Sequence, residues 1–188
     1  MDDIDIRTSL QATFDAEGIG WVNEVTIRDR RIDMVAMIDG VLTGIEIEAH
    51  PATLRRLPVQ KRRYTSRFRH LVIATAESQL REVLAGLPPC WGVLVASWTP
   101  GGLTLERRKA PARAASDPGK AQPKLLVEMM SVSEIEAALG LAPDAARQKP
   151  DLVPLMLKRS VPEIEAAFLT AQQQRKVLKR PQRAIEQS

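Results

Sequence analysis

The chain has 188 residues, of which 44% are hydrophobic and 27% are charged, a balance typical of a globular protein. Its single cysteine excludes an internal disulfide framework and any zinc site built from several cysteines. The N-terminal stretch is acidic, unlike a signal peptide, and no apolar run approaches the roughly 18 residues of a membrane helix, so we expect a cytoplasmic protein without a membrane contact.

The first half of the chain predicts a helix followed by strands. Apolar residues at helical spacing predict a helix over 3–17, and alternation of apolar and polar residues predicts a strand over 21–27. Two further apolar runs, 31–38 and 41–49, are separated by Asp39-Gly40, a strong signal for a two-residue hairpin turn because both residues tolerate positive φ. We therefore predict an antiparallel hairpin here.

The next stretch alternates helices and strands. A basic helix is predicted over 53–68, a buried strand over 70–75, a helix over 76–87 and a strand over 90–97, followed by a short hairpin-like piece at 102–108. This order predicts an α/β domain over 1–106, with a central mixed β-sheet flanked by helices.

The last third differs in composition. Residues 107–124 are rich in Ala, Pro and Lys, which predicts a basic flexible linker. Beyond it, 125–188 is expected to form a small helical region in which SVSEIEAAL, 131–139, recurs as SVPEIEAAF, 160–168. Each copy has Ser followed three residues later by Glu, the capping box of a helix start. Two short helix repeats are an expected docking surface for a protein partner or a homodimer.

A basic segment follows the hairpin. No acid occurs between Glu48 and Glu77, and such a block of one sign is commonly neutralised by polyphosphate, although a solvated basic helix face is an open alternative. Gln60 and Tyr64 are four residues apart and share a helical face. The predicted nucleic-acid-binding residues are Arg55, Arg56, Lys61, Arg62, Arg63 and Arg67.

Three acids lie in the predicted hairpin. Counting from the turn places Asp33 opposite Glu46 and Arg31 opposite Glu48, all on one face. Opposed carboxylates repel each other, so this arrangement favours a bound hard cation such as Mg²⁺; simple ion pairs at a solvated edge are the alternative. The other face is predicted to be core, formed by Ile32, Met34, Ala36, Ile38, Val41, Ile45 and Ile47.

These motifs resemble a known family. An Asp on one strand, Glu-x-Lys on the next and Gln-x-x-x-Tyr on the following helix are typical of the PD-(D/E)XK, or restriction-endonuclease-like, nucleases and of their RecB-like branch. Arg31-Ile32-Asp33, Gly44 to Ile47, Thr53 to Gln60, Tyr64 and Pro88 to Gly92 resemble most closely the small bacterial "sce seven-seven-two-six" family, with Glu48 in place of the motif Lys.

The resemblance implies a metal-dependent nuclease of bacterial or phage origin acting on DNA, with RNA as an alternative. The implied ligands of Mg²⁺ or Mn²⁺ are Asp33, Glu46 and the Ile47 backbone carbonyl. Gln60 and Tyr64 would position the scissile strand. Glu48 would act as general base or hold a second ion, so that the implied catalytic residues are Asp33, Glu46, Glu48, Gln60 and Tyr64.

Two other functions remain open at this stage. The Glu48 departure also fits a silenced nuclease fold that serves as a nucleic-acid-binding or adaptor module. A protein-binding regulator acting through the helical repeats is the third alternative.

Overall fold

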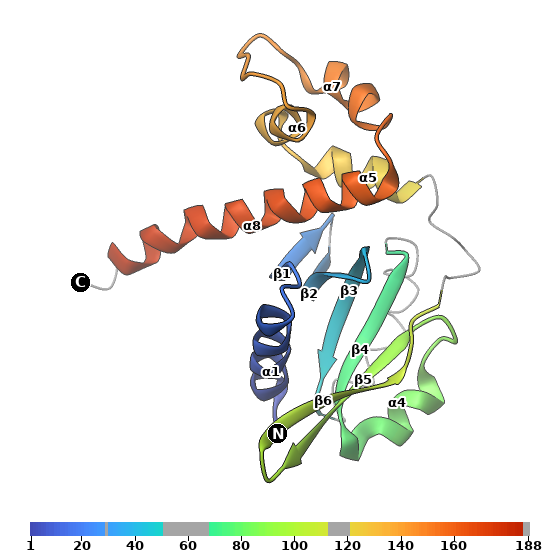
Figure 1. Ribbon diagram of the computed structural model, residues 1–188. Coiled ribbons are helices and arrows are strands. Elements are labelled where there is room, and N and C mark those ends of the chain that lie inside the picture. Colours follow the sequence, from blue (N-terminus) through green and yellow to red (C-terminus); the bar gives the residue numbers. More distant parts are fainter. Residues whose placement is uncertain (29, 51–67, 113–120, 186–188) are drawn as a thin grey trace.

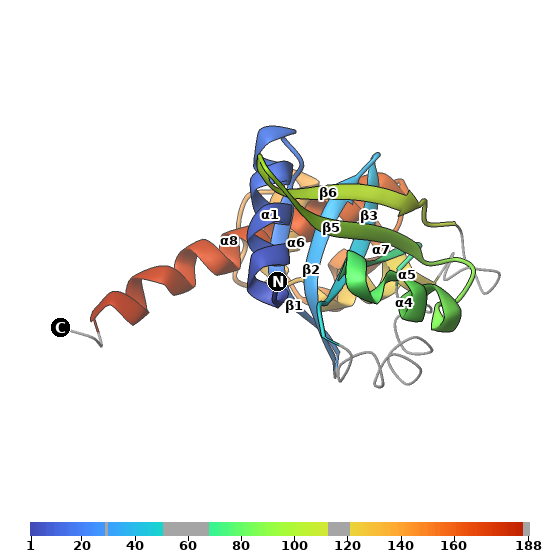
Figure 2. The same ribbon diagram turned by 90° about the horizontal axis from the view of Figure 1, so that it is seen from below.

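The computed structural model describes residues 1–28, 30–50, 68–112 and 121–185, without the side chains of 30, 121 and 178–185. It confirms the predicted α/β fold: one six-stranded mixed sheet, in the order β1-β2-β3-β4-β5-β6, is flanked by helices on both faces (Figures 1 and 2). Strands β3, β4 and β5 run parallel, whereas the outer pairs are antiparallel. None of the helices in this part of the chain has the length and apolarity needed to cross a bilayer.

The elements follow the predicted order closely. The strands are β1 (Trp21–Ile27), β2 (Arg30–Ile38), β3 (Val41–Glu48), β4 (His70–Ala76), β5 (Gly92–Thr99) and β6 (Gly102–Lys109). The helices are α1 (Asp3–Ala16), the 3-10 turn η1 (Glu77–Gln79), α4 (Leu80–Gly86), α5 (Ala121–Met129), α6 (Val132–Leu139), α7 (Lys149–Met156) and α8 (Val161–Ile185). The predicted helix 53–68 lies almost wholly outside the described residues.

The predicted hairpin is confirmed. Asp39 and Gly40 have φ of 52° and 71°, the left-handed values that a type I′ turn requires. Ile38 pairs with Val41, as predicted, and the register continues to Met34 and Ile45. This register places the ends of β2 and β3 that carry the acids beside each other.

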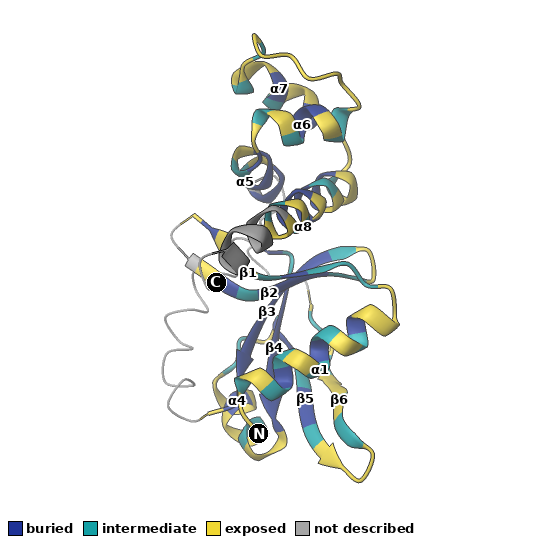
Figure 3. Ribbon diagram, turned by 90° about the vertical axis from the view of Figure 1, so that its left-hand side faces the viewer, coloured by how far each residue is buried: buried dark blue, intermediate teal, exposed yellow. Residues whose placement is uncertain are grey.

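Each face of the sheet has its own hydrophobic core. Helix α1 places Ile6, Leu10 and Phe14 against one face, in a cluster that includes Ile45 and Ile47 of β3. The opposite face is covered by α4 and by the C-terminal helices, with residues such as Val83 and Phe168 in a single cluster with the sheet. Figure 3 shows the buried strands between these layers.

The predicted alternation along β2 is wrong at Asp33. Ile32 belongs to the cluster under the C-terminal helices, whereas Met34 belongs to the cluster under α1, although both were expected on one face. The cause is a ladder irregularity: the β1–β2 pairing passes from Met34 to Ile32 without a pair at Asp33, and Glu24, across from Asp33, has φ of 52°. Alternation alone therefore does not bring Arg31, Asp33 and the two glutamates to one face.

The helical region packs directly on the sheet. Helix α8 lies over β1, β2 and β3, and α5 packs against α8. The buried Glu165 carboxylate of α8 accepts hydrogen bonds from the Leu42 amide of β3 (3.1 Å), from Arg69 (3.0 and 2.9 Å) and from Gln122 (3.3 Å). These bonds and the shared cluster join the C-terminal helices to the α/β core.

The predicted linker is shorter than 107–124 at both ends. Strand β6 continues to Lys109 because its backbone pairs with β5 as far as Val93, so the hairpin-like piece is a full strand. Helix α5 begins at Ala121, so 121–124 are helical. Residues 113–120 lie outside the described part.

The internal repeat forms two helix starts. Ser131 and Glu134 make the predicted capping box at α6, and the Glu163 carboxylate accepts from the Ser160 amide (2.8 Å) before α8. The helices do not pack as two separate sequential pairs, because α5 packs against α8 and α6 packs against α7.

Gly44, in the middle of β3, allows close packing over the sheet. A Cβ atom there would lie 2.5 Å from Ile32 Cδ1, 3.0 Å from Leu71 Cδ2 and 3.1 Å from Phe68 Cδ2. We expect Gly44→Ala to lower the free energy of unfolding by about 1–3 kcal/mol, because this overpacking forces core side chains to shift. Urea unfolding measures the change, and a variant as stable as the wild type would contradict it.

Candidate functional site

Glu46 and Glu48 lie on one face of β3 near its carboxyl end. Ile45 and Ile47, between and beside them, point into the α1 core, so the two glutamates point to the opposite face. Both are almost fully buried, with exposed fractions of 3% and 5%. Across the parallel ladder they neighbour Ile73 and Thr75, and the Thr75 hydroxyl donates to the Glu48 carbonyl (2.7 Å). Two acidic side chains are therefore buried on this face of the sheet.

Asp33 approaches the same stretch of β3 from β2. Its Oδ2 accepts a hydrogen bond from the Ile47 amide, the residue between the two glutamates (3.0 Å). In a strand the N–H and C=O of one residue point toward the same neighbouring strand, so the Ile47 carbonyl also points toward the Asp33 side. Asp33 and the Ile47 carbonyl, two of the predicted metal ligands, therefore lie beside each other.

Arg7 of α1 is a site residue that the sequence analysis did not identify. Its Nη1 donates to the Asp33 carbonyl (2.9 Å) and its Nη2 to the Asp33 Oδ1 (3.2 Å). One turn earlier, the Asp3 carboxylate accepts from the Ala49 amide, just beyond β3 (2.8 Å). The available signal was charge: Arg7 is the only basic residue among the first 27. Helix α1 thus holds both strands at the acidic end.

Arg31, predicted opposite Glu48, lies 3.6 Å from Glu24 across the β1–β2 pair. In the β1–β2 ladder Arg31 pairs with Thr26, so the unpaired position Asp33 lies between Arg31 and Met34. Arg69, next to the basic segment, contacts the buried Glu165, so its charge is already neutralised within the fold.

The donor set suits a hard cation. Carboxylate and carbonyl oxygens are the ligands that Mg²⁺ prefers, and it is commonly held by only one or two carboxylates. Asp33, the Ile47 carbonyl and Glu46 meet this requirement by residue type, and the Asp33 carboxylate bonds to the Ile47 amide. Within the described ranges, no group of three or more His, Cys, Asp or Glu side chains is gathered to hold a metal ion.

The predicted residues of the basic segment lie outside the described residues. These are Gln60 and Tyr64, together with Arg55, Arg56, Lys61, Arg62, Arg63 and Arg67. Their placement beside the acids stays a prediction. The described chain resumes at Phe68, which is fully buried.

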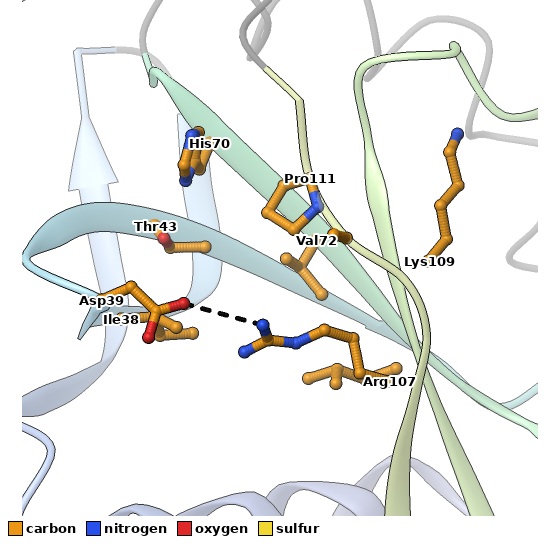
Figure 4. A pocket seen from close by; sticks show the side chains of 10 residues that line it. Ile38, Asp39, Thr43, His70, Val72, Arg107, Lys109 and Pro111 are labelled. Carbon is orange, nitrogen blue, oxygen red and sulfur yellow. Dashed lines mark ion pairs between the residues drawn. The ribbon is translucent and has the colours of Figure 1, made fainter.

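A small pocket of about 100 Å³ lies at the other end of β3 (Figure 4). His70 and the apolar Val72 line it, and an ion pair between Asp39 and Arg107 (3.6 Å) lies at its side. Burial, and next the charge of Arg69, lower the pKa of His70, which favours the neutral imidazole near pH 7. Substrate pockets typically exceed about 300 Å³, so this hollow is not the candidate site.

Comparisons with known proteins give one family and a shared fold. The family described as bacteriophage P4 protein cII matches residues 15–181. A protein of unknown function from Silicibacter pomeroyi is similar in structure at 17% identity, with a TM-score of 0.50, over 63% of this chain and 77% of that one. The structure of Pyrococcus furiosus SfsA in complex with Ca²⁺ matches at 12% identity and a TM-score of 0.31, over 57% and 59%. No curated protein matches the chain.

The family match covers most of the chain. It begins at the end of α1 and extends through the sheet into α8, so that Asp33, Glu46 and Glu48 all lie within it. The chain belongs to the bacteriophage P4 protein cII family.

Proposed function

We propose that this protein is a metal-dependent nuclease of the PD-(D/E)XK type that hydrolyses DNA phosphodiester bonds. The observation that carries the proposal is the acidic end of the hairpin: Glu46 and Glu48 are buried on one face of β3, and Asp33 bonds to the amide between them. Carboxylate and carbonyl oxygens are the ligands that a hard divalent ion prefers, and such an ion is commonly held by one or two carboxylates together with a substrate phosphate.

The acids and the Ile47 carbonyl would have different roles in catalysis. Asp33, Glu46 and the Ile47 carbonyl would hold Mg²⁺ or Mn²⁺, which when bound polarises a phosphodiester and lowers the pKa of a water molecule. Glu48, in place of the lysine of the resemblance, would accept a proton from the attacking water.

The basic segment would hold the nucleic acid. Gln60 and Tyr64 would position the scissile strand, and the arginines and lysine of 55–67 would contact flanking phosphates. The support is compositional: no acid interrupts the stretch between Glu48 and Glu77.

Cleavage of labelled linear and circular DNA, single- and double-stranded, tests the proposal in Mg²⁺ and then in Mn²⁺, with RNA as a parallel substrate. We expect the wild type to cut DNA, EDTA to stop it and Asp33→Ala to lose at least 100-fold in rate, since a metal ligand contributes several kcal/mol to charge stabilisation. Absence of cleavage under every ion, or equal rates for wild type and Asp33→Ala, would overturn it.

A silenced nuclease that binds nucleic acid is the second candidate. It is favoured by one contact, because the Arg7 guanidinium pairs with the Asp33 carboxylate and balances its charge. Under this alternative, wild-type protein binds DNA in EDTA without cutting it under any ion, and Glu48→Lys acquires cleavage. Cleavage by the wild type would exclude the alternative.

A further inference from the structure

Arg7 is held in a fixed position at the acidic end of the hairpin. It comes from the first half of α1, and its two contacts with Asp33 involve both the backbone oxygen and the carboxylate. The side chains of Arg7 and Asp33 are 24% and 30% exposed, so the pair is partly open to solvent. A guanidinium held in this way has little rotamer freedom left to lose when it binds a further group.

The two contacts leave donors unused. A guanidinium carries several N–H donors in a planar fork, and Asp33 takes one from each terminal nitrogen. Within the described residues Arg7 makes no other hydrogen bond or ion pair. The remaining donors suit a second acceptor of bidentate shape, and phosphate and carboxylate have that shape.

The charges around Arg7 favour a role for its guanidinium in phosphate binding over a purely structural ion pair with Asp33. The Asp33 carboxylate would repel an approaching phosphodiester. The Arg7 guanidinium contacts this carboxylate directly, at 3.2 Å. A phosphate next to Asp33 would therefore meet a preorganised positive charge on the α1 side.

We infer that Arg7 binds a backbone phosphate of the nucleic acid while it keeps Asp33 in place, so that helix α1 forms part of the substrate-binding surface. This deepens the proposed function and rests on it. The ligand class is a phosphodiester, recognised by charge and bidentate geometry and not by base sequence.

Salt-dependent DNA binding in EDTA, measured by fluorescence anisotropy, tests this role without cleavage. Loss of one phosphate contact lowers the slope of log Kd against log salt by about 0.9 for duplex and about 0.7 for single strands. We expect Arg7→Met to show this change with roughly tenfold weaker binding, and Arg7→Lys to recover most of the slope. Gln11→Met, one turn further along α1, is the matched control and should behave as the wild type.

A double-mutant cycle separates phosphate binding from simple neutralisation of Asp33. If Arg7 acts only as a counter-ion, Arg7→Met should have no effect on DNA binding once Asp33→Asn removes the charge; direct contact predicts that the loss persists. An unchanged slope in Arg7→Met, or a loss that disappears in the Asp33→Asn background, overturns the inference, while cleavage by the wild type upholds the proposed function. Wild-type protein that neither binds nor cuts nucleic acid overturns both.

Discussion

Glu46→Gln should abolish metal-dependent cleavage, with a loss of about 1,000-fold or more in rate. Glutamine keeps the size of the side chain but removes the charge that a divalent ion needs, and metal ligation of the reacting phosphate is worth several kcal/mol. A second readout does not depend on activity. Mg²⁺ or Mn²⁺ should raise the melting temperature of the wild type, since a ligand that binds only the folded state stabilises it, and this rise should disappear in Glu46→Gln.

The matched control is Glu82→Gln, which removes an exposed carboxylate from α4. It should cut at the wild-type rate and keep the metal-induced rise. Far-UV circular dichroism of both variants in metal-free buffer verifies that each is folded. Glu46→Gln protein that still responds to metal would place the ion elsewhere.

Glu165→Ala should lower the free energy of unfolding by about 3–5 kcal/mol. The Glu165 side chain is fully buried. Its removal leaves the Leu42 amide, the Arg69 guanidinium and the Gln122 amide without this hydrogen-bond acceptor. Breaking a buried ion pair on one side leaves an uncompensated charge, which is the main source of the loss. Equilibrium urea unfolding measures the change.

Gln174→Ala, at an exposed position of the same helix, is the control for Glu165→Ala. It should change the free energy of unfolding by less than about 0.5 kcal/mol. If Glu165→Ala were equally mild, the bonds between α8 and β3 would not contribute to the stability of the sheet.

Local patterns were sufficient for most of the fold. The Asp39-Gly40 turn, the strand at 21–27 and the Ser131–Glu134 capping box each depend on neighbours in sequence, and each is confirmed. The full length of β6 was missed because its exposed, charged end gives no apolar pattern. It forms a strand because β5 offers backbone partners as far as Val93.

The features that were missed depend on distant residues. A non-glycine residue with positive φ, such as Glu24, has no sequence signature, so the break in alternation at Asp33 was not predictable. Arg7 and Asp33 are 26 positions apart, and Arg69 and Glu165 are 96 apart. Without a fold in hand, no spacing rule connects such pairs.

The shared cluster under α8 has a consequence for how the chain is made in the cell. Because synthesis starts at the N-terminus, the whole sheet is made before α8. The apolar face that carries Val35, Leu42 and Ile73 therefore lacks the cover of α8 until Phe168 has left the ribosome. Exposed apolar faces are the surfaces on which nascent chains aggregate and which chaperones and proteases recognise. A chain released before α8 is made would therefore expose this apolar face to chaperones and proteases. The sheet needs α8 to be complete before this face is buried.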